Sequence, residues 1–298
     1  MHGLLVVDKP EGPTSFDVVH AVRRKVKQVI GERRMKVGHT GTLDPFASGV
    51  LPIAVGDATR LCEYLIEGDK LYRVVLRLGV QTDTDDRTGA VIGESDWTGM
   101  DPAEVRSAVE GLVGTFDQVP PRYSAIHVDG RRAYDLARKG REVELEARSV
   151  TVYAVTVSSV ELPEVRFDVR TSKGTYVRAL CRDLGAQLGG HGHCAGLQRL
   201  ASAGFGIAEA VPLEQVLEAT EAELEAMLQP PSTMLHAVEQ VEVDAAGRLA
   251  LCHGQRLAVG HGQAEGGVVW VSASGELICV AVVEADGRLK PHKVFARP

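Results

Sequence analysis

The 298-residue sequence predicts an α+β fold, in which a mixed, mainly antiparallel sheet is flanked by helices and followed by a small C-terminal β-barrel. Segments that alternate apolar and polar residues, as strands do, lie between segments whose apolar residues recur at the spacing of amphipathic helices. After about Val238 the chain changes to short strands separated by glycine turns, a pattern typical of a small barrel. We therefore expect two domains, over residues 1–237 and 238–298.

The first half of the large domain shows two strands and a helix. The apolar run Gly3–Val7 predicts a buried strand that a turn stops. A helix follows, capped by Thr14 or Ser15, with valines at helical spacing on one face and basic residues on the other. Leu71–Val80 alternates as a strand, and Tyr72 lies on its apolar face.

The second half continues the alternation of helices and strands. Residues 101–114 predict a helix that Asp101-Pro102 opens and Gly114 closes. Val150–Val160 and Val165–Arg170 alternate as strands and lead into a strand-to-helix segment, TSKGTYVRALCRDLG. Residues 213–228 predict one acidic amphipathic helix, which a proline pair stops.

The composition, with 44% apolar residues, favours a globular protein. No apolar run is long enough to span a membrane and the N-terminus lacks signal-peptide features, so we expect a cytoplasmic location. Five scattered cysteines indicate reduced thiols. The net charge of −7 comes mostly from residue 211 onward, whereas residues 1–210 carry 27 basic and 28 acidic side chains. Basic clusters at 23–36 and 122–141 can bind phosphates or simply form solvated surfaces.

The segment Lys36–Ile53, KVGHTGTLDPFASGVLPI, surrounds a single acidic side chain, Asp44, with glycine, hydroxyl and apolar residues. Its glycines allow a tightly shaped loop, and Pro45 biases Asp44 toward an extended conformation. A carboxylate anchored beside a pocket can act as a nucleophile, a general base or a metal ligand. The structural alternative is that Asp44 merely starts a turn before Pro45.

Two further residues have a structural and a functional interpretation. Arg178 can hold a carboxylate in a bidentate pair and keep it ionised, or it can form an ordinary surface ion pair. Tyr72, from its position in the strand pattern, is expected to be a core tyrosine.

Two clusters contain metal-binding residue types. The first comprises Asp83, Asp85 and Asp86, and the second His191, His193 and Cys194 with Cys181. A calcium loop starting at Asp83 would need glycine where Thr88 stands, so a polar loop with helix-capping acids is the better interpretation. The histidine and cysteine run matches no recurrent zinc spacing, and its glycines indicate a flexible turn. We predict no metal and no cofactor.

The stretch GHTGTLDPFASGVLP closely resembles the active-site motif of the TruB family of tRNA pseudouridine synthases. Further segments resemble the family's other motifs: LLVVDKPEGPTSFDVV, LYRVVLRLGV, VPPRYSAIHVDGRRAYDLARKG, KGTYVRAL and LQRLASAGF. The resemblance implies a pseudouridine synthase catalytic core with an RNA-gripping insertion near residues 119–148. Residues 238–298 resemble, more weakly, a PUA-like RNA-binding domain.

The resemblance also implies a role for individual residues. Asp44 corresponds to the catalytic aspartate, Arg178 to the arginine that pairs with it, and Tyr72 to a tyrosine that stacks on the target base and is proposed to assist proton removal. The implied substrate-binding residues are His39, near the flipped-out uridine, Tyr176, which lines the pocket, and Leu197, which packs against the base.

The implied reaction is isomerisation of uridine 55 in the T-loop of tRNA to pseudouridine, by base flipping and attack of Asp44 on either C6 of the base or C1′ of the ribose. The expected partner is the T-arm of tRNA, and we expect a monomer with no obligate protein partner and no membrane association. Two alternatives remain open: a guide-RNA-dependent relative of the dyskerin type, and an RNA-folding chaperone without catalysis.

Overall fold

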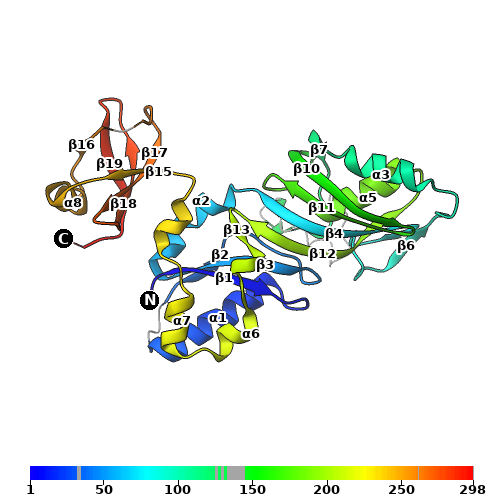
Figure 1. The fold of residues 1–298 in the computed structure, drawn as a ribbon, viewed down its shortest axis with the longest axis horizontal. Coiled ribbons are helices and arrows are strands. Elements are labelled where there is room, and N and C mark those ends of the chain that lie inside the picture. The colour runs from blue at the N-terminus through cyan, green and yellow to red at the C-terminus, as the bar shows by residue number, and fades with distance from the viewer. Residues whose placement is uncertain (32–34, 125–126, 129–130, 133–144, 261, 298) are drawn as a thin grey trace.

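A computed structural model of the chain shows an elongated molecule, with one large sheet along its length and a smaller sheet at one end (Figure 1). The structure describes all residues except 32–34, 125–126, 129–130, 133–144, 261 and 298. No helix among the described residues is long and apolar enough to cross a membrane. The predicted α+β class is confirmed.

The large sheet has the strand order β14-β1-β3-β12-β4-β11-β10-β7, with β2 paired to β3 and β13 to β12. Its pairs are antiparallel except β1 with β14 and β12 with β3. Its strands are β1 (Gly3–Lys9), β2 (Val37–His39), β3 (Ser48–Val55), β4 (Lys70–Leu78), β7 (Gly114–Gln118), β10 (Arg148–Glu161), β11 (Glu164–Thr171), β12 (Gly192–Ser202), β13 (Phe205–Gly206) and β14 (Val211–Pro212). The sheet is therefore mixed and mainly antiparallel, as predicted.

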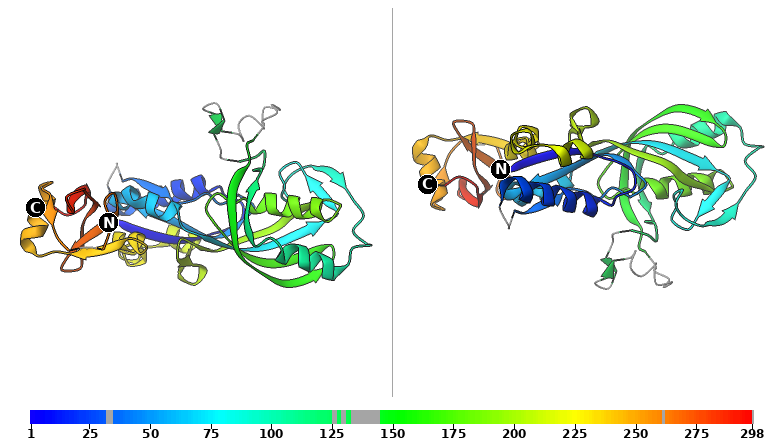
Figure 2. Two further views of the ribbon diagram at one scale, coloured as in Figure 1. Left: turned by 90° about the horizontal axis from the view of Figure 1, so that it is seen from above. Right: turned by 90° about the horizontal axis from the view of Figure 1, so that it is seen from below.

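Two short ribbons accompany this sheet. They are β5 (Val80–Thr82) with β6 (Val91–Glu94), and β8 (His127–Val128) with β9 (Arg131–Arg132). The β8–β9 ribbon stands out from the side of the molecule (Figure 2). The predicted gripping insertion near 119–148 falls mostly outside the described residues.

Helix α1 (Ser15–Ile30) begins where the sequence predicts. Thr14 is its N-cap, and its side chain and that of Asp17 satisfy each other's backbone N–H groups in a capping box. The buried valines of α1 pack against apolar residues of β1 and β3. α6 (Leu213–Glu218) and α7 (Glu221–Met227) lie beside α1 at the same end of the sheet (Figure 1).

The other end of the sheet is covered by α3 (Pro102–Glu110) and α5 (Val177–Gln187), which pack on β10 and β12. The apolar face of β4 points into this core, since Tyr72, Val74 and Leu76 are all buried, as their alternation predicts. α3 starts at the Asp101 cap as expected but ends at Gly111, because the chain turns there to begin β7.

The prediction of one helix over residues 213–228 is wrong. The chain leaves the helical conformation at Ala219, and Thr220 starts α7 with a capping box to Glu223. A threonine followed three residues later by a glutamate is a helix-start signal inside the apparent helix. This signal outweighs the continuous apolar pattern.

The glycines before Leu197 do form a turn at residues 188–190, but the turn does not extend to the later glycines as predicted. Gly192 begins β12, and His193 and Cys194 are buried within it. A β-carbon on Gly185 of α5 would lie 2.3 Å from the Gly192 nitrogen. Glycine is therefore present because the helix and the strand approach closely, which the sequence pattern alone does not distinguish from flexibility.

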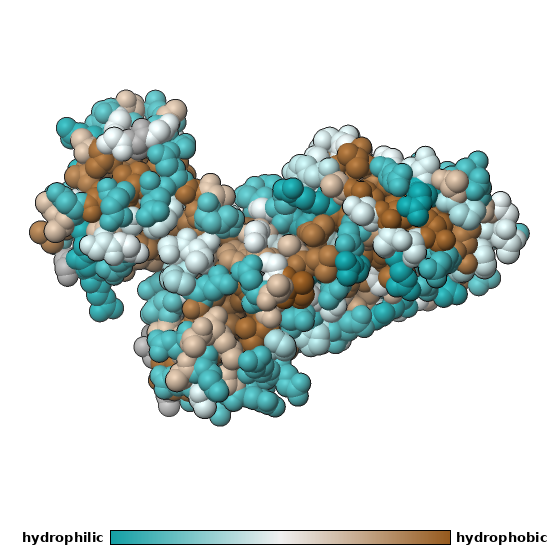
Figure 3. Space-filling view, viewed as in Figure 1, coloured by the Kyte–Doolittle hydropathy of each residue, from teal (hydrophilic) through white to brown (hydrophobic). Residues whose placement is uncertain are grey.

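The smaller sheet is curled and has the order β15-β17-β18-β19-β16. Its elements are β15 (Glu239–Glu242), α8 (Ala245–Cys252), β16 (Leu257–Ala258), β17 (Val268–Ala273), β18 (Glu276–Val283) and β19 (Arg288–Val294). Figure 3 shows it as a lobe of its own.

This lobe contacts the rest of the molecule through three short helices: η1 (Gly56–Leu61), α2 (Cys62–Ile66) and η3 (Pro231–Leu235). Another short helix, η2 (Ile207–Glu209), follows β13. Arg60 donates to the Val294 carbonyl at 2.7 Å, and Lys293 donates to the Arg60 carbonyl at 2.6 Å. An apolar cluster that includes Leu61 and Val280 lies beneath these bonds. The lobe is thus attached by both polar and apolar contacts.

Candidate active site

Asp44 lies in the loop between β2 and β3, and the main chain of this loop is hydrogen-bonded at successive residues. The Ser15 hydroxyl, at the start of α1, accepts from the Leu43 nitrogen at 2.8 Å and donates to the Leu43 carbonyl at 2.9 Å. The Pro45 carbonyl accepts from the Gly12 nitrogen at 2.7 Å. The backbone on both sides of Asp44 is therefore fixed by the segment that joins β1 to α1.

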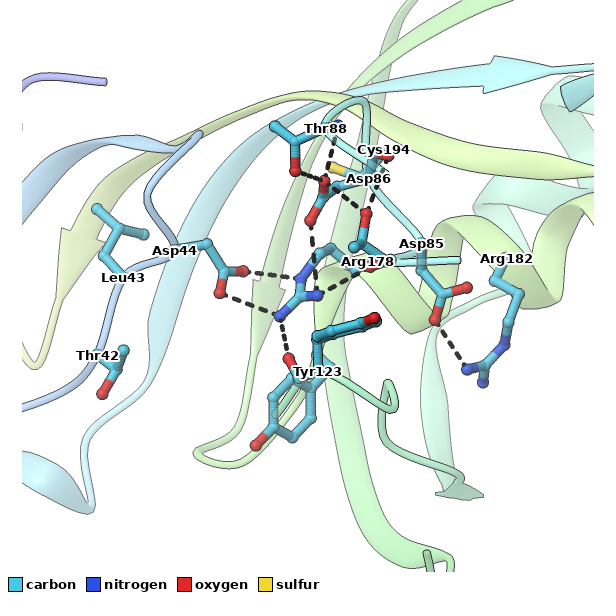
Figure 4. Close-up of polar contacts among 12 residues, drawn as sticks. Thr42, Leu43, Asp44, Asp85, Asp86, Thr88, Tyr123, Arg178, Arg182 and Cys194 are labelled. Carbon is cyan, nitrogen blue, oxygen red and sulfur yellow. Dashed lines mark hydrogen bonds and ion pairs between the residues drawn. The ribbon is translucent and has the colours of Figure 1, made fainter. Parts of the chain in front are cut away.

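The Asp44 carboxylate is held by Arg178 in the first turn of α5. The Nε and Nη2 atoms of Arg178 donate to the two carboxylate oxygens at 2.9 and 3.0 Å, which makes a bidentate pair (Figure 4). The Arg178 side chain is 5% exposed and that of Asp44 is 30% exposed. The carboxylate is thus oriented from the protein side and remains open on the other. Asp44 also starts the turn that the structural alternative expects, since its carbonyl accepts from the Ala47 nitrogen at 3.1 Å.

Arg178 is itself fixed by three further groups around it. Its Nη1 donates to the Thr84 carbonyl at 2.9 Å and lies 3.6 Å from Asp86, and its Nη2 also donates to the Tyr123 carbonyl at 3.0 Å. Asp86 in turn accepts from the Thr88 nitrogen and hydroxyl. A guanidinium with this many partners has one available orientation (Figure 4).

Two aspartates of the 82–89 loop, Asp85 and Asp86, therefore support arginines, whereas Asp83 accepts from the Ala90 nitrogen, and the prediction that these acids cap a helix is wrong. Asp85 pairs with Arg182 at 3.1 Å, one helical turn beyond Arg178. Burial raises the pKa of Asp85, and the charges of Arg182 and Arg178 act in the opposite direction. Among the described residues no group of three metal-ligating side chains is close enough to hold an ion.

A pocket of about 590 Å³ opens beside Asp44, a size typical of small-ligand sites. Five of the six predicted site residues line it: Asp44, Tyr72, Tyr176, Arg178 and Leu197. They come from the β2–β3 loop, β4, the N-cap of α5, α5 itself and β12, so segments far apart in the sequence converge here.

Tyr72 and Leu197 form an apolar wall, being only 8% and 7% exposed. Tyr176 is held through its main chain, because Gln118 accepts from its nitrogen and donates to its carbonyl. Burial raises the pKa of the Tyr176 phenol, so its ring is neutral at physiological pH.

His39 is the one predicted site residue that does not line the pocket. It ends β2, and its Nδ1 accepts from the Gly41 nitrogen at 3.3 Å. Burial lowers the pKa of His39, so the ring stays neutral and keeps a lone pair for that bond. In this structure His39 shapes the start of the Asp44 loop.

Three buried basic residues are not among the predicted site residues: Lys9, Lys70 and Arg199. The resemblance of LLVVDKPEGPTSFDVV to a family motif implies that Lys9 helps to build the site without being catalytic, whereas no pattern in the sequence pointed to Lys70 or Arg199. Lys9 donates to the carbonyls of Pro10 and Pro13 at 2.8 and 2.9 Å, and burial lowers the pKa of its amine to about 8. Lys70 donates to the Ile66 carbonyl at 2.8 Å, and burial likewise lowers its pKa to about 8.

Comparison with known proteins identifies the family of this chain. Residues 25–177 match the sequence model of the TruB family pseudouridylate synthase N-terminal domain, and residues 178–236 match that of the tRNA pseudouridylate synthase B C-terminal domain. The chain belongs to the TruB family of pseudouridylate synthases. It is therefore a pseudouridine synthase, and the loop that carries Asp44 lies inside the matched N-terminal domain.

Curated relatives within the TruB family carry the same description. The tRNA pseudouridine synthase B of Geobacter sulfurreducens is 45% identical over 248 residues, covering 83% of this chain and 80% of that protein. The enzyme of the same name from Burkholderia pseudomallei (strain 668) is 40% identical over 99% of this chain and 97% of that protein. A solved chain from a Cbf5-Nop10-Gar1 complex superimposes with a TM-score of 0.75 at 25% identity, covering 99% of this chain and 85% of that one.

Proposed function

We propose that this TruB-family member converts uridine 55 in the T-loop of tRNA to pseudouridine, with Asp44 as the nucleophile. The observation that carries the proposal is the Asp44 carboxylate, held bidentately by a buried arginine at the wall of a pocket large enough for a nucleotide. The arginine orients both carboxylate oxygens, and the open side of the carboxylate faces the space that a flipped base would enter.

The reaction is an isomerisation, so atoms and electrons balance within the nucleotide. Attack of the Asp44 carboxylate on C6 of the uracil or C1′ of the ribose leads to cleavage of the C1′–N1 bond. The base then rotates and a C1′–C5 bond forms. In the C1′ route the carboxylate leaves C1′ as this bond forms, and the C5 proton then departs; in the C6 route the C5 proton departs and the carboxylate is then eliminated from C6. A nucleophile and a proton acceptor are sufficient for these steps, and no cofactor is required.

We assign the other pocket residues by position. Tyr72 presents its ring to the pocket from β4 and stacks on the base, with its phenol oxygen available as an acceptor for the C5 proton. Leu197 packs against the base from β12, and Tyr176 closes the pocket at the N-terminus of α5. His39 supports the loop that carries the nucleophile.

We also propose that residues 1–237 form the catalytic domain and residues 238–298 a PUA-like RNA-binding domain, and that the protein acts as a monomer on the T-arm. The names of the relatives support a tRNA substrate. A flipped base and its neighbours require contacts on single-stranded, splayed nucleotides, which suits a pocket with several aromatic side chains.

The guide-dependent alternative rests on solved chains such as the 25% identical one from the Cbf5-Nop10-Gar1 complex, whereas relatives of 40–45% identity are named tRNA pseudouridine synthase B. A chaperone without catalysis would need neither a held carboxylate nor a pocket behind it. Both alternatives predict no product when the protein alone meets bare tRNA.

The test is release of tritium from 5-tritiated uridine in unmodified tRNA transcripts, using the protein alone. Wild type, Asp44→Asn and a transcript with cytidine at position 55 are run in parallel. We expect release by wild type from the uridine-55 transcript only. Full release by Asp44→Asn would remove the nucleophile assignment, and no release by wild type despite tRNA binding would favour one of the alternatives.

A further inference from the structure

Arg199 in β12 is a buried cation that binds the main chain of the Asp44 loop. It is 1% exposed and is the largest fully buried side chain of the described residues. Its three guanidinium nitrogens all donate to main-chain carbonyls: Nε to Val50 at 2.7 Å, Nη1 to Thr42 at 3.2 Å and Nη2 to Gly41 at 3.2 Å.

These carbonyls lie on both sides of Asp44 in the sequence. Gly41 and Thr42 precede it, and Val50 follows it within β3. The guanidinium therefore links the two ends of the loop, since one planar group binds both the strand after the loop and the residues before Asp44. Arg199 also lines the pocket, so the side chain that binds the loop is itself part of the pocket wall.

The main chain of Arg199 is fitted to the same strand. It pairs with Gly49 in the parallel β12–β3 contact. A β-carbon on Gly49 would lie 2.3 Å from the Arg199 carbonyl oxygen, and Gly49 has a φ of +105°. This close approach allows the guanidinium to reach Val50 and the loop beyond it.

Among the described residues, no carboxylate lies within ion-pair distance of the Arg199 guanidinium. Burying a charge costs several kcal/mol of desolvation, and an apolar side chain of equal length would avoid that cost. Core packing therefore does not explain an arginine at this position. Three charge-assisted bonds to the loop do, because the three nitrogens of one guanidinium reach carbonyls on both sides of Asp44.

We propose that Arg199 is a positioning residue for the pseudouridine synthase reaction: it fixes the main chain of residues 41–50, so that Arg178 and Arg199 together set the position of Asp44 against the base. This inference rests on Asp44 being the nucleophile. Arg178 orients the carboxylate, whereas Arg199 holds the backbone that carries it. Because Arg199 is buried, it acts on the chemical step and leaves the affinity for tRNA unchanged.

The experiment measures the single-turnover rate of tritium release and the tRNA Kd for Arg199→Lys and Arg199→Met. Lysine keeps the charge and can reach one or two carbonyls, and methionine keeps the length with no donor. A displacement of about 1 Å in a reacting group can cost ~100-fold in rate, so we expect a loss of this order for Arg199→Met, a smaller loss for Arg199→Lys and a Kd within about twofold of wild type. Arg23→Lys is the control, since Arg23 is half-buried and donates to a single main-chain oxygen, that of Val37, outside the loop.

Each outcome decides the assignment. Wild-type rate in a folded Arg199→Lys or Arg199→Met, or a Kd that rises in proportion to the loss of rate, would overturn it. If Arg199→Met does not fold, Arg199→Lys decides alone, and if neither variant folds, Arg199 is a residue of the fold and the positioning role is rejected. Asp44→Asn in the same assay separates the two proposals, since an active Asp44→Asn would contradict the nucleophile assignment itself.

Discussion

Replacing Arg178 with methionine separates what this arginine contributes to stability from what it contributes to the reaction. Its guanidinium forms the bidentate pair with Asp44, donates to the carbonyls of Thr84 and Tyr123, and lies 3.6 Å from Asp86. Methionine occupies similar space but provides no donor and no charge. The expected result is a folded, less stable protein that binds tRNA and forms no pseudouridine.

The stability loss can be worked from burial. The side chain of Asp86 is 7% exposed, so it would remain as a buried charge without its cation, which costs about 3–5 kcal/mol. Asp44 is 30% exposed and partly hydrated, so its contribution to stability is smaller. At about 2–4 °C per kcal/mol, the midpoint of thermal unfolding should fall by ~6–20 °C.

The double variant Asp86→Asn/Arg178→Met tests this reasoning. Asparagine removes the charge and keeps an acceptor for the Thr88 nitrogen and hydroxyl, so the double variant should be more stable than Arg178→Met alone. Its single-turnover rate should stay as low, because Asp44 still lacks its partner. Thermal melts and tritium release measure the two quantities. A double variant no more stable than Arg178→Met, or one that regains activity, would refute the assignment of separate roles.

Three further predictions concern the surroundings of the site. Burial lowers the pKa of Lys9 from 10.5 to about 8, so the unfolded chain binds more protons than the folded one above pH 8. Wild type should therefore gain stability relative to Lys9→Met as pH rises from 8 to 10.5. A difference in thermal midpoint between the two proteins that does not change with pH would contradict this. Gly49→Ala should destabilise the protein far more than the ~1–2 kcal/mol expected for the control Gly31→Ala. Gly31 also has a positive φ, but a β-carbon there would meet nothing within 4 Å. Equal urea midpoints for the two variants would argue against the close approach of Gly49 to Arg199. Lys293→Ala removes bonds from the C-terminal lobe to Arg60 of η1 and Glu63 of α2, so it should weaken tRNA binding and leave the single-turnover rate unchanged. A slower rate at saturating tRNA would show that the lobe also contributes to the chemical step.

The elements that the sequence predicts well are those with local signals. The alternation in β4 places Tyr72 on the buried face, and the Thr14–Asp17 capping box marks the start of α1. The apolar periodicity of residues 213–228 fails because a second cap lies inside it at Thr220. Periodicity reports which face is buried, and two consecutive short helices can share one buried face without being one helix.

Part of the site could be predicted because its motifs are contiguous, and part could not because its contacts are long-range. Asp44 stands out within its own segment, and the resemblance of KGTYVRAL to a known motif points to Arg178. The roles of Asp85 and Asp86 depend on which helix packs over their loop, and neither aspartate has a local feature that indicates an arginine partner. The sequence therefore identifies residues that stand inside a contiguous motif, such as Asp44 and Arg178, and does not identify residues whose role depends only on long-range packing.

The buried basic residues carry a signal that hydropathy hides. Lys9 continues the inward-facing positions of Leu5 and Val7 in β1, and Arg199 is two residues from the pocket-facing Leu197 in β12. Period-two alternation places both side chains on the inner face, whereas their charge argues for the surface. Alternation and charge therefore give opposite predictions for these two residues. A basic side chain at the end of an apolar face can point inward when the neighbouring loop has backbone oxygens with no strand partner, because those oxygens need hydrogen-bond donors. Both residues bind carbonyls close to Asp44 in the chain. A basic residue at an inward-facing strand position therefore indicates a loop whose backbone is held by a buried charge.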